Sequence, residues 1–170
     1  MTCADSCPLE QFPQHSESGG IVLDDEYICR AAFDPDDLDR AGVVKPRIIP
    51  NSHFFERNEI SVWRITSPDA SSLKEIVQLI KLDPSKRVDR FMCVEVRKVR
   101  SLHRQQSNCQ RLCVLDECEI DRDGNTDPRH AHVSRCRYGI EMGKNADDPR
   151  LQATLLALRD LFKNAHSVSV

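Results

Sequence analysis

The feature that most constrains the fold is an amphipathic segment near the C-terminus, DDPRLQATLLALRDLFKN, residues 147–164. Its apolar residues recur with helical spacing, so one stripe of the helix must be buried against another part of the chain. Asp147 or Asp148 can cap this helix, and Pro149 suits its first turn. The stripe consists of Leu151, Leu155, Leu158 and Phe162. A helix of this kind needs a partner layer, and the rest of the chain has to supply it.

The sequence predicts that this partner layer is a β-sheet. Alternating apolar and polar residues predict strands at 26–31, 59–66, 90–99, 111–120 and 129–136. One more amphipathic helix is expected in SSLKEIVQLIKLD, residues 71–83, with Ser71 or Ser72 as its cap. Because strands outnumber helices and neighbouring strands look hairpin-connected, the expected class is α+β. A mixed or antiparallel sheet carries one internal helix, and the long C-terminal helix packs on it.

A chain of 170 residues fits one domain with a hydrophobic core. Residues 1–20 are polar and end in Gly19–Gly20, so we expect a disordered tail there and a single domain over 21–170. The segment 34–58 is broken by prolines and reads as a long irregular connection. Long loops of this kind often serve function, so we expect residues 34–58 to contact a partner.

Overall charge and hydropathy exclude some classes of protein. The net charge is −3 and only 5% of residues are aromatic, which disfavours a nucleic-acid binder that depends on basic patches and stacking. No apolar run approaches the roughly 20 residues of a membrane span. The first 20 residues lack the basic start and apolar stretch of a signal peptide, so the expected location is cytoplasmic.

Charge is unevenly distributed along the chain. Residues 24–39 hold seven acids and one arginine, whereas residues 86–104 hold seven basic residues and two acids. Opposed patches of this kind suit a contact within the molecule or with a partner. A solvated surface with chance clustering is the plainer interpretation, and the sequence leaves both open.

The chain has eight cysteines, at Cys3, Cys7, Cys29, Cys93, Cys109, Cys113, Cys118 and Cys136. In a cytoplasmic protein, disulfides are not expected to frame the fold. The cysteines are then either metal ligands or buried thiols that pack as small apolar groups. No CxxC pair occurs, so spacing alone does not define a zinc site.

The stretch DRDGNTDPRHAHVSRC, residues 121–136, is the richest in chemically active side chains. His130 and His132 share one face of the predicted strand, and Cys136 has the same parity, so the three could bind zinc with one further ligand. A calcium loop of the EF-hand type would place His130 where a bidentate glutamate is needed. Alternatively, the stretch is a hairpin with an Asp-Gly turn, in which Ala131 and Val133 face the core.

One ordered set of residues resembles the Arg…Ser…Glu-x-Glu pattern of ADP-ribosyltransferase-like domains. It comprises Arg30 on the first strand, Ser61 on the second, and Glu117 and Glu119 on a later one. The resemblance implies an enzyme that uses NAD. In it Arg30 would bind the dinucleotide phosphates, Ser61 would support the site, Glu119 would orient the ribose and Glu117 would assist an acceptor.

The segments CRAAF, FFERNEISVW and DPRHAHV are also similar to a group of small bacterial proteins without an assigned activity. That likeness implies no mechanism. The first functional hypothesis is therefore a small accessory or protein-interaction module without enzymatic activity. Its contacts would be made by residues 34–58, the tail and the opposed charge patches. The alternative hypothesis is an ADP-ribosyltransferase-like enzyme, which requires Arg30, Ser61 and Glu119 to line one cleft.

Overall fold

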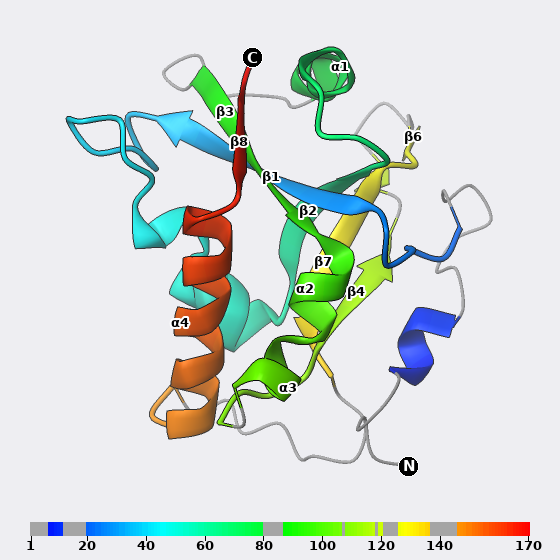
Figure 1. Ribbon diagram of the computed structural model, residues 1–170, viewed down its shortest axis with the longest axis vertical. Helices are drawn as coiled ribbons and strands as arrows, with labels where there is room; N and C mark the ends of the chain where they lie inside the picture. The colour runs from blue at the N-terminus through cyan, green and yellow to red at the C-terminus, as the bar shows by residue number, and fades with distance from the viewer. Residues whose placement is uncertain are drawn as a thin grey trace.

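A computed structural model describes residues 7–11, 20–79, 87–106, 108–117, 119–120, 126–136 and 146–170. Its centre is a six-stranded antiparallel sheet in the order β4-β7-β2-β1-β3-β8 (Figure 1). The strands are β1 (Tyr27–Asp34), β2 (Ile60–Ile65), β3 (Arg87–Glu95), β4 (Leu112–Asp116), β7 (His130–Arg135) and β8 (His166–Ser169). A separate pair consists of β5 (Glu119–Ile120) and β6 (Thr126–Asp127). The predicted α+β class is confirmed.

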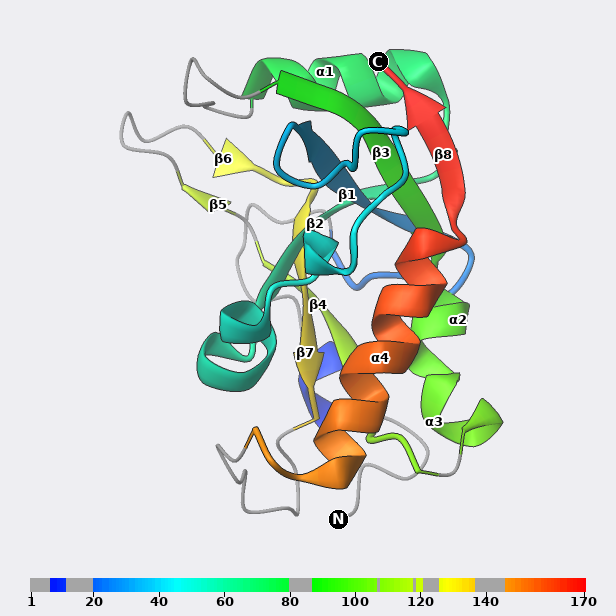
Figure 2. The same cartoon turned by 90° about the vertical axis from the view of Figure 1, so that its left-hand side faces the viewer.

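The helices surround this sheet. They are α1 (Ala70–Leu79), α2 (Val96–Arg100), α3 (Leu102–Gln105) and α4 (Pro149–Lys163). Three shorter helical segments are η1 (Pro8–Gln11), η2 (Pro46–Ile48) and η3 (Ser52–Arg57). Figure 2 shows α1 lying across one end of the sheet and α4 running alongside it. The helices thus cover different parts of the sheet.

Both faces of the sheet are buried, because alternate residues of each strand enter different clusters. On β2, Ile60 and Val62 belong to the larger cluster, whereas Trp63 and Ile65 pack with the smaller one. We call these the α4 face and the α1 face. The α4 face includes the helix stripe, and the α1 face includes Leu73 and Ile76 of α1.

Helix α4 confirms the prediction made from its spacing. The four residues of the stripe are each at most 4% exposed: Leu151, Leu155, Leu158 and Phe162. Asp148 is the cap, since its side chain accepts the backbone N–H of Arg150 at 2.8 Å. Pro149 occupies the first turn, where a missing N–H costs nothing.

Helix α1 is capped differently from the expectation. Asp69, rather than Ser71 or Ser72, accepts the backbone N–H groups at the start of the helix, at 3.0 Å and 2.9 Å respectively. The two serine hydroxyls also donate to this carboxylate. The pKa of Asp69 is lowered to about 2 by these hydrogen bonds, the one from Ser71 foremost. The expected end of the helix, at 80–83, lies outside the described residues.

Some strand limits also differ from the prediction. The strand expected over 90–99 ends at Glu95, and α2 begins at Val96. The strand expected over 111–120 ends as β4 at Asp116, and Glu119 belongs to the separate pair. Strand β8 was not predicted, because HSVS is too short and polar for an alternating pattern to be recognised.

The N-terminal region is only partly described. Of residues 7–11, expected within a tail, Pro8–Gln11 form η1, which packs on the edge strand β4, and Cys7 is fully buried. Residues 1–6 and 12–19 lie outside the described residues. In the parts of the chain that are described, no helix is both long and apolar enough to cross a membrane.

The segment 34–58 is not a free loop. Its large apolar residues fill the α4 face and are at most 5% exposed: Ile48, Ile49, Phe54 and Phe55. A bridge between Leu38 and Val44 closes its first half. Asn58, at φ 58°, ends η3 in the left-handed region and is buried. The apolar residues therefore anchor this segment, which leaves chiefly polar positions for a partner.

Candidate functional site

Two of the residues suggested by the resemblance lie on opposite faces of the sheet. Arg30 alternates with Ile28 and Ala32, which belong to the α4 face. Ser61 alternates with Ile60 and Val62 of that face, so its side chain points to the α1 face. The structure therefore does not bring the Arg30 and Ser61 side chains into one cleft.

Arg30 instead contacts the main chain of its own core. Its guanidinium donates to the carbonyl oxygen of Ile48 and, at 2.6 Å, to that of Ser61. Burial lowers the pKa of Arg30 to about 10, and the charge of Asp37 opposes that shift. Its fork thus binds backbone carbonyls and links the segment 34–58 to β2.

Other predicted residues do come together, on the α1 face at the β4 side of the sheet. Ser61 pairs with His132 across β2 and β7, and His132 pairs with Leu115 of β4. Glu117 lies two residues further on, and its carboxylate contacts Nδ1 of His132. The ring of His130 lies 4.7 Å from that of His132, and its Nδ1 is 2.9 Å from the Glu117 carbonyl oxygen. The backbone of Glu119 is in β5, and its side chain lies outside the described residues.

His130 and His132 share a face as expected, but Cys136 belongs to a different cluster. Cys7, Cys113 and Cys136 are buried together, and their three sulfur atoms lie within 4.8 Å of one another. Among the described residues, no group of three metal-ligating side chains includes either histidine. A metal at Cys136 would therefore use a ligand set other than the predicted one.

Disulfides are present, contrary to the expectation from the cysteine spacing. Cys7 is bonded to Cys113, and Cys29 is bonded to Cys93. Cys29 and Cys93 are direct partners in the β1–β3 register, with Cα atoms 4.1 Å apart. Cys109 is a buried free thiol whose pKa is raised, chiefly by burial. Linear spacing could not reveal these pairs, because strand register brings Cys29 and Cys93 together and the packing of η1 on β4 brings Cys7 to Cys113.

Among the described residues, the opposed charge patches meet within the molecule at two points. Asp34 pairs with Arg87 at 2.9 Å, and Asp24 pairs with Arg100 at 2.6 Å. Contacts within the molecule thus account for part of the uneven distribution of charge along the chain. At these two points the charges are matched within the chain.

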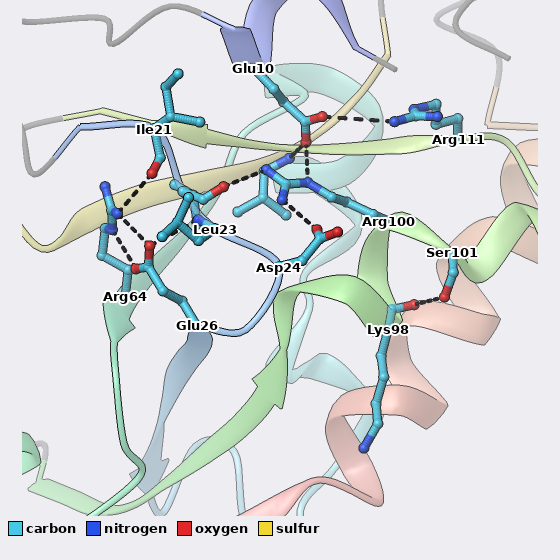
Figure 3. A network of polar contacts seen from close by, with 12 residues as sticks. Glu10, Ile21, Leu23, Asp24, Glu26, Arg64, Lys98, Arg100, Ser101 and Arg111 are labelled. Atoms are coloured by element: carbon cyan, nitrogen blue, oxygen red, sulfur yellow. Dashed lines mark hydrogen bonds and ion pairs between the residues drawn. The ribbon is translucent and has the colours of Figure 1, made fainter. Parts of the chain in front are cut away.

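A buried cluster around Arg64, which we call the Arg64 cluster, lies at the edge of the α4 face (Figure 3). Arg64 binds Glu26 through two hydrogen bonds of 2.8 Å and 2.6 Å and binds Asp116 at 3.0 Å. The three residues are 8%, 7% and 4% exposed, respectively. Burial alone would lower the pKa of Arg64, but the two carboxylates outweigh it and raise the pKa.

A second arginine, Arg100, organises the neighbouring contacts in Figure 3. Its guanidinium pairs with Glu10 of η1 at 2.8 Å and with Asp24. Glu10 also accepts the backbone N–H of Val114 at 2.6 Å, so η1 covers the outer edge of β4. Burial alone would lower the pKa of Arg100, but Glu10 and Asp24 raise it.

Both arginines fix the backbone of residues 20–26, which we call the strap. Arg64 donates to the carbonyl oxygens of Gly20 and Ile21, and Arg100 donates to that of Val22 at 2.9 Å. The N–H of Leu23 donates to Glu26 at 2.8 Å. Gly20 adopts φ +84°, a region that side-chain-bearing residues rarely occupy.

The strap presents two aliphatic side chains to the outside. Val22 is buried, whereas Ile21 and Leu23 are 44% and 56% exposed. They line a cavity of about 470 Å³. The other residues around it are Glu26, Arg64, Ile65, Thr66, Ser72, Glu75, Pro128 and Arg129. We call this the strap groove.

Sequence reasoning missed the strap groove. A signal was present, because IVL follows a Gly-Gly pair and precedes the first strand, where an exposed aliphatic residue needs an explanation. The partners of Arg64 were not visible, because Glu26 and Asp116 are 38 and 52 residues from Arg64 in the sequence.

The fold and these sites define an antiparallel α+β domain with a pre-formed apolar groove and a buried cysteine cluster. Comparison with known proteins adds no relative: no protein family, curated protein or solved structure matches the chain.

Proposed function

We propose that the chain is a protein-interaction module rather than an enzyme, and that its strap groove binds an extended apolar segment of a partner protein. One observation carries the proposal. Ile21 and Leu23 are exposed side chains on a backbone whose three consecutive carbonyl groups are bound by Arg64, which is buried, and Arg100, which is partly buried. A soluble domain seldom fixes exposed aliphatic residues so firmly without a use for them.

The rigidity of the strap supports binding because it reduces the entropy lost on association. Residues on a mobile loop must be immobilised when a partner docks, which weakens binding. Here Arg64 and Arg100 already hold residues 20–22 in the free protein. Burying the charges of the Arg64 cluster carries a desolvation cost. Holding the strap in one conformation is a benefit for binding that can account for keeping the cluster despite that cost.

The composition of the strap groove suggests the kind of occupant. Ile21, Leu23, Ile65 and Pro128 give it an apolar lining. Glu75 and Arg129, paired at 3.1 Å, form part of a polar rim. An apolar centre with a polar rim is the usual anatomy of a recognition site, and the volume suits a few side chains.

The other surfaces suggested by the sequence have less support. The segment 34–58 uses its large apolar residues in the core, although Val43 remains 48% exposed. The NAD-dependent alternative requires Arg30 and Ser61 in one cleft, and their side chains lie on opposite faces. Of the residues of the alternative, Glu117 lines a cavity of about 270 Å³, and the lining of that cavity includes neither Arg30 nor Ser61.

The experiment selects ligands from a displayed library of random peptides and measures their affinity by fluorescence anisotropy. We expect selected peptides to carry aliphatic or aromatic anchors. Burying Leu23 contributes about 1–2 kcal/mol, so Leu23→Asp should weaken binding by about five- to thirtyfold. Leu156→Asp is the matched control, since Leu156 is equally exposed, at 57%, but lies on α4.

Three other results would contradict the proposal. They are an absence of enriched peptides, binding that survives Leu23→Asp, and binding that Leu156→Asp reduces equally. Sedimentation of the wild type tests a second copy of the chain as occupant. A dimer that Leu23→Asp dissociates would replace the partner segment with self-association.

A further inference from the structure

We propose that the Cys7–Cys113 disulfide regulates the strap groove, so that its reduction loosens the strap and weakens the binding of a partner. The inference rests on the function proposed above for that groove. Four contacts connect the disulfide to the strap: Cys7 to Cys113, Glu10 to Arg100, and Arg100 to both Asp24 and Val22. Each of them joins segments that are distant in the sequence.

The disulfide attaches η1 to the edge strand β4. Cys7 directly precedes η1, and Cys113 lies on β4, opposite Ser134 of β7. Both cysteines are at most 1% exposed. The hydrogen bond of 2.6 Å from the Val114 N–H to Glu10 adds to this attachment. Because η1 has only four residues and is too short to be stable alone, its position depends on such links to the sheet.

Glu10 connects η1 to Arg100, and Arg100 contacts the strap (Figure 3). The side chain of Glu10 is 10% exposed and pairs with the guanidinium of Arg100 at 2.8 Å. Arg100 also pairs with Asp24 and donates to the carbonyl oxygen of Val22. Asp24 is the weaker of the two acidic partners, since its side chain is 68% exposed and its charge is screened by water. Glu10 is therefore the main counter-charge that holds the guanidinium against the strap.

Reduction of the disulfide removes the covalent support for this arrangement. Glu10 is then held less tightly, and Arg100 can leave the carbonyl oxygen of Val22. Arg64 still holds the start of the strap, so the strap loosens around Leu23 without detaching from the domain. A partner segment must then immobilise these residues when it docks, and the ordering costs free energy of association.

A cavity gives small thiols access to the disulfide. It has a volume of about 270 Å³, and its lining includes Leu9 of η1 together with Cys113 and Leu115 of β4. A thiolate attacks Sγ of Cys113 to form a mixed disulfide, and the electron pair of the broken S–S bond leaves on Cys7, which takes up a proton. A second thiol molecule then releases the Cys113 thiol. The two thiol molecules become one disulfide and have supplied two electrons and two protons.

The first measurement follows the strap of the full chain without a partner, by ¹⁵N relaxation. We expect order parameters near about 0.85 for Leu23 and Asp24 in the wild type, and below about 0.6 in Cys7→Ser/Cys113→Ser, the double serine variant. Both sulfur atoms are replaced because Cys136 is itself disulfide-bonded and its Sγ is 3.8 Å from that of Cys7. Neither position can then exchange with the disulfide of Cys136.

Two further variants separate regulation from a general loss of stability. Cys29→Ala/Cys93→Ala removes a disulfide that does not contact η1, so the order parameters of the strap should not change. Glu10→Gln keeps every disulfide and an oxygen that can accept the Val114 N–H, but it lacks the charge that pairs with Arg100. It should loosen the strap by itself. Adding the double serine change should then have little further effect, because both changes act through the same contact.

The second measurement uses the peptides selected on the strap groove. Reduced glutathione should weaken their binding to the wild type by about tenfold, which corresponds to ordering about one residue. The double serine variant should bind them as weakly with glutathione as without it, which assigns the effect to this disulfide.

The proposal is overturned by strap order parameters that are equal in the wild type and the double serine variant. It is also overturned if Cys29→Ala/Cys93→Ala lowers them as much, or if the effects of Glu10→Gln and the double serine change are fully additive. An absence of peptide binding to the oxidised wild type contradicts the proposed function alone, because the order parameters test the link between disulfide and strap separately.

Discussion

Arg30 and Arg64 occupy similar places and are stabilised in different ways. Both point toward the α4 face, from the neighbouring strands β1 and β2. Arg64 contacts two buried carboxylates as well as strap carbonyls, whereas the hydrogen bonds of Arg30 go to the carbonyl oxygens of Ile48 and Ser61. The pKa of Arg64 is raised, while that of Arg30 is lowered to about 10.

The difference shows which kinds of partner stabilise a buried cation. Carbonyl dipoles satisfy the N–H groups of Arg30 but do not offset its charge, so burial dominates its pKa. The carboxylates of Glu26 and Asp116 supply both hydrogen bonds and opposite charge. The Arg64 cluster is therefore interdependent, whereas removing Arg30 breaks hydrogen bonds to carbonyl groups and weakens only a longer-range attraction to Asp37.

The largest expected effect is on stability. Arg64→Met leaves Glu26 and Asp116 buried without their cation, which should cost about 3–5 kcal/mol. Arg30→Met leaves only two carbonyl groups without a donor, so we expect about 1–3 kcal/mol. Urea unfolding of both variants against wild type measures the two values.

Adding Glu26→Gln to Arg64→Met provides the internal control. It removes one of the two uncompensated charges, so the double variant should be less destabilised than the sum of the single variants. A larger loss of stability from Arg30→Met than from Arg64→Met would contradict this comparison, because carbonyl partners would then contribute more to stability than carboxylate partners.

The next prediction concerns ligand binding, where the expected effect is smaller than the effect on stability. This prediction tests Arg30 alone. In the NAD-dependent alternative the planar fork of Arg30 binds phosphates, so Arg30→Lys would abolish dinucleotide binding. Because that fork already binds the carbonyls of Ile48 and Ser61, we expect calorimetric titration of the wild type with NAD to give no heat. Heat that disappears in Arg30→Lys would instead support the enzyme.

The contrast between Arg30 and Arg64 also shows how much of the fold could be predicted from the sequence. Alternation predicted a strand at 59–66, which the structure contains as β2, and spacing identified the buried stripe of α4. Local periodicity determines these features. It also placed His130 and His132 on one face, where their rings are neighbours.

Features that depend on strand register were not predictable. The resemblance relied on the order Arg30, Ser61 and Glu119, but order does not determine which face each residue occupies relative to the others. The partners of Cys113 and Cys136 include Cys7, over 100 residues away, in a segment that composition alone marked as a tail. The sequence contains these cysteines, and the three-dimensional fold determines which of them lie together.

The smallest expected effect concerns His53 of η3, whose titration reports the charge of Arg30. The pKa of His53 is lowered, first by burial and then by the positive charges of Arg30 and Arg57. We expect Arg30→Met to raise this pKa, and Arg57→Met to raise it less. The pKa of each protein is measured by following the imidazole resonance of His53 by NMR as a function of pH.

The sign of the linked stability follows from the lowered pKa. The unfolded chain binds a proton at His53 near pH 6.5, whereas the folded chain does so only at lower pH. His53 thus contributes stability above pH 6.5 that is lost as the pH falls toward its folded pKa. In Arg30→Met the two pKa values are closer, so this loss should be smaller. An unchanged His53 pKa in Arg30→Met would mean that the charge of Arg30 is compensated locally, and the contrast with Arg64 would then fail.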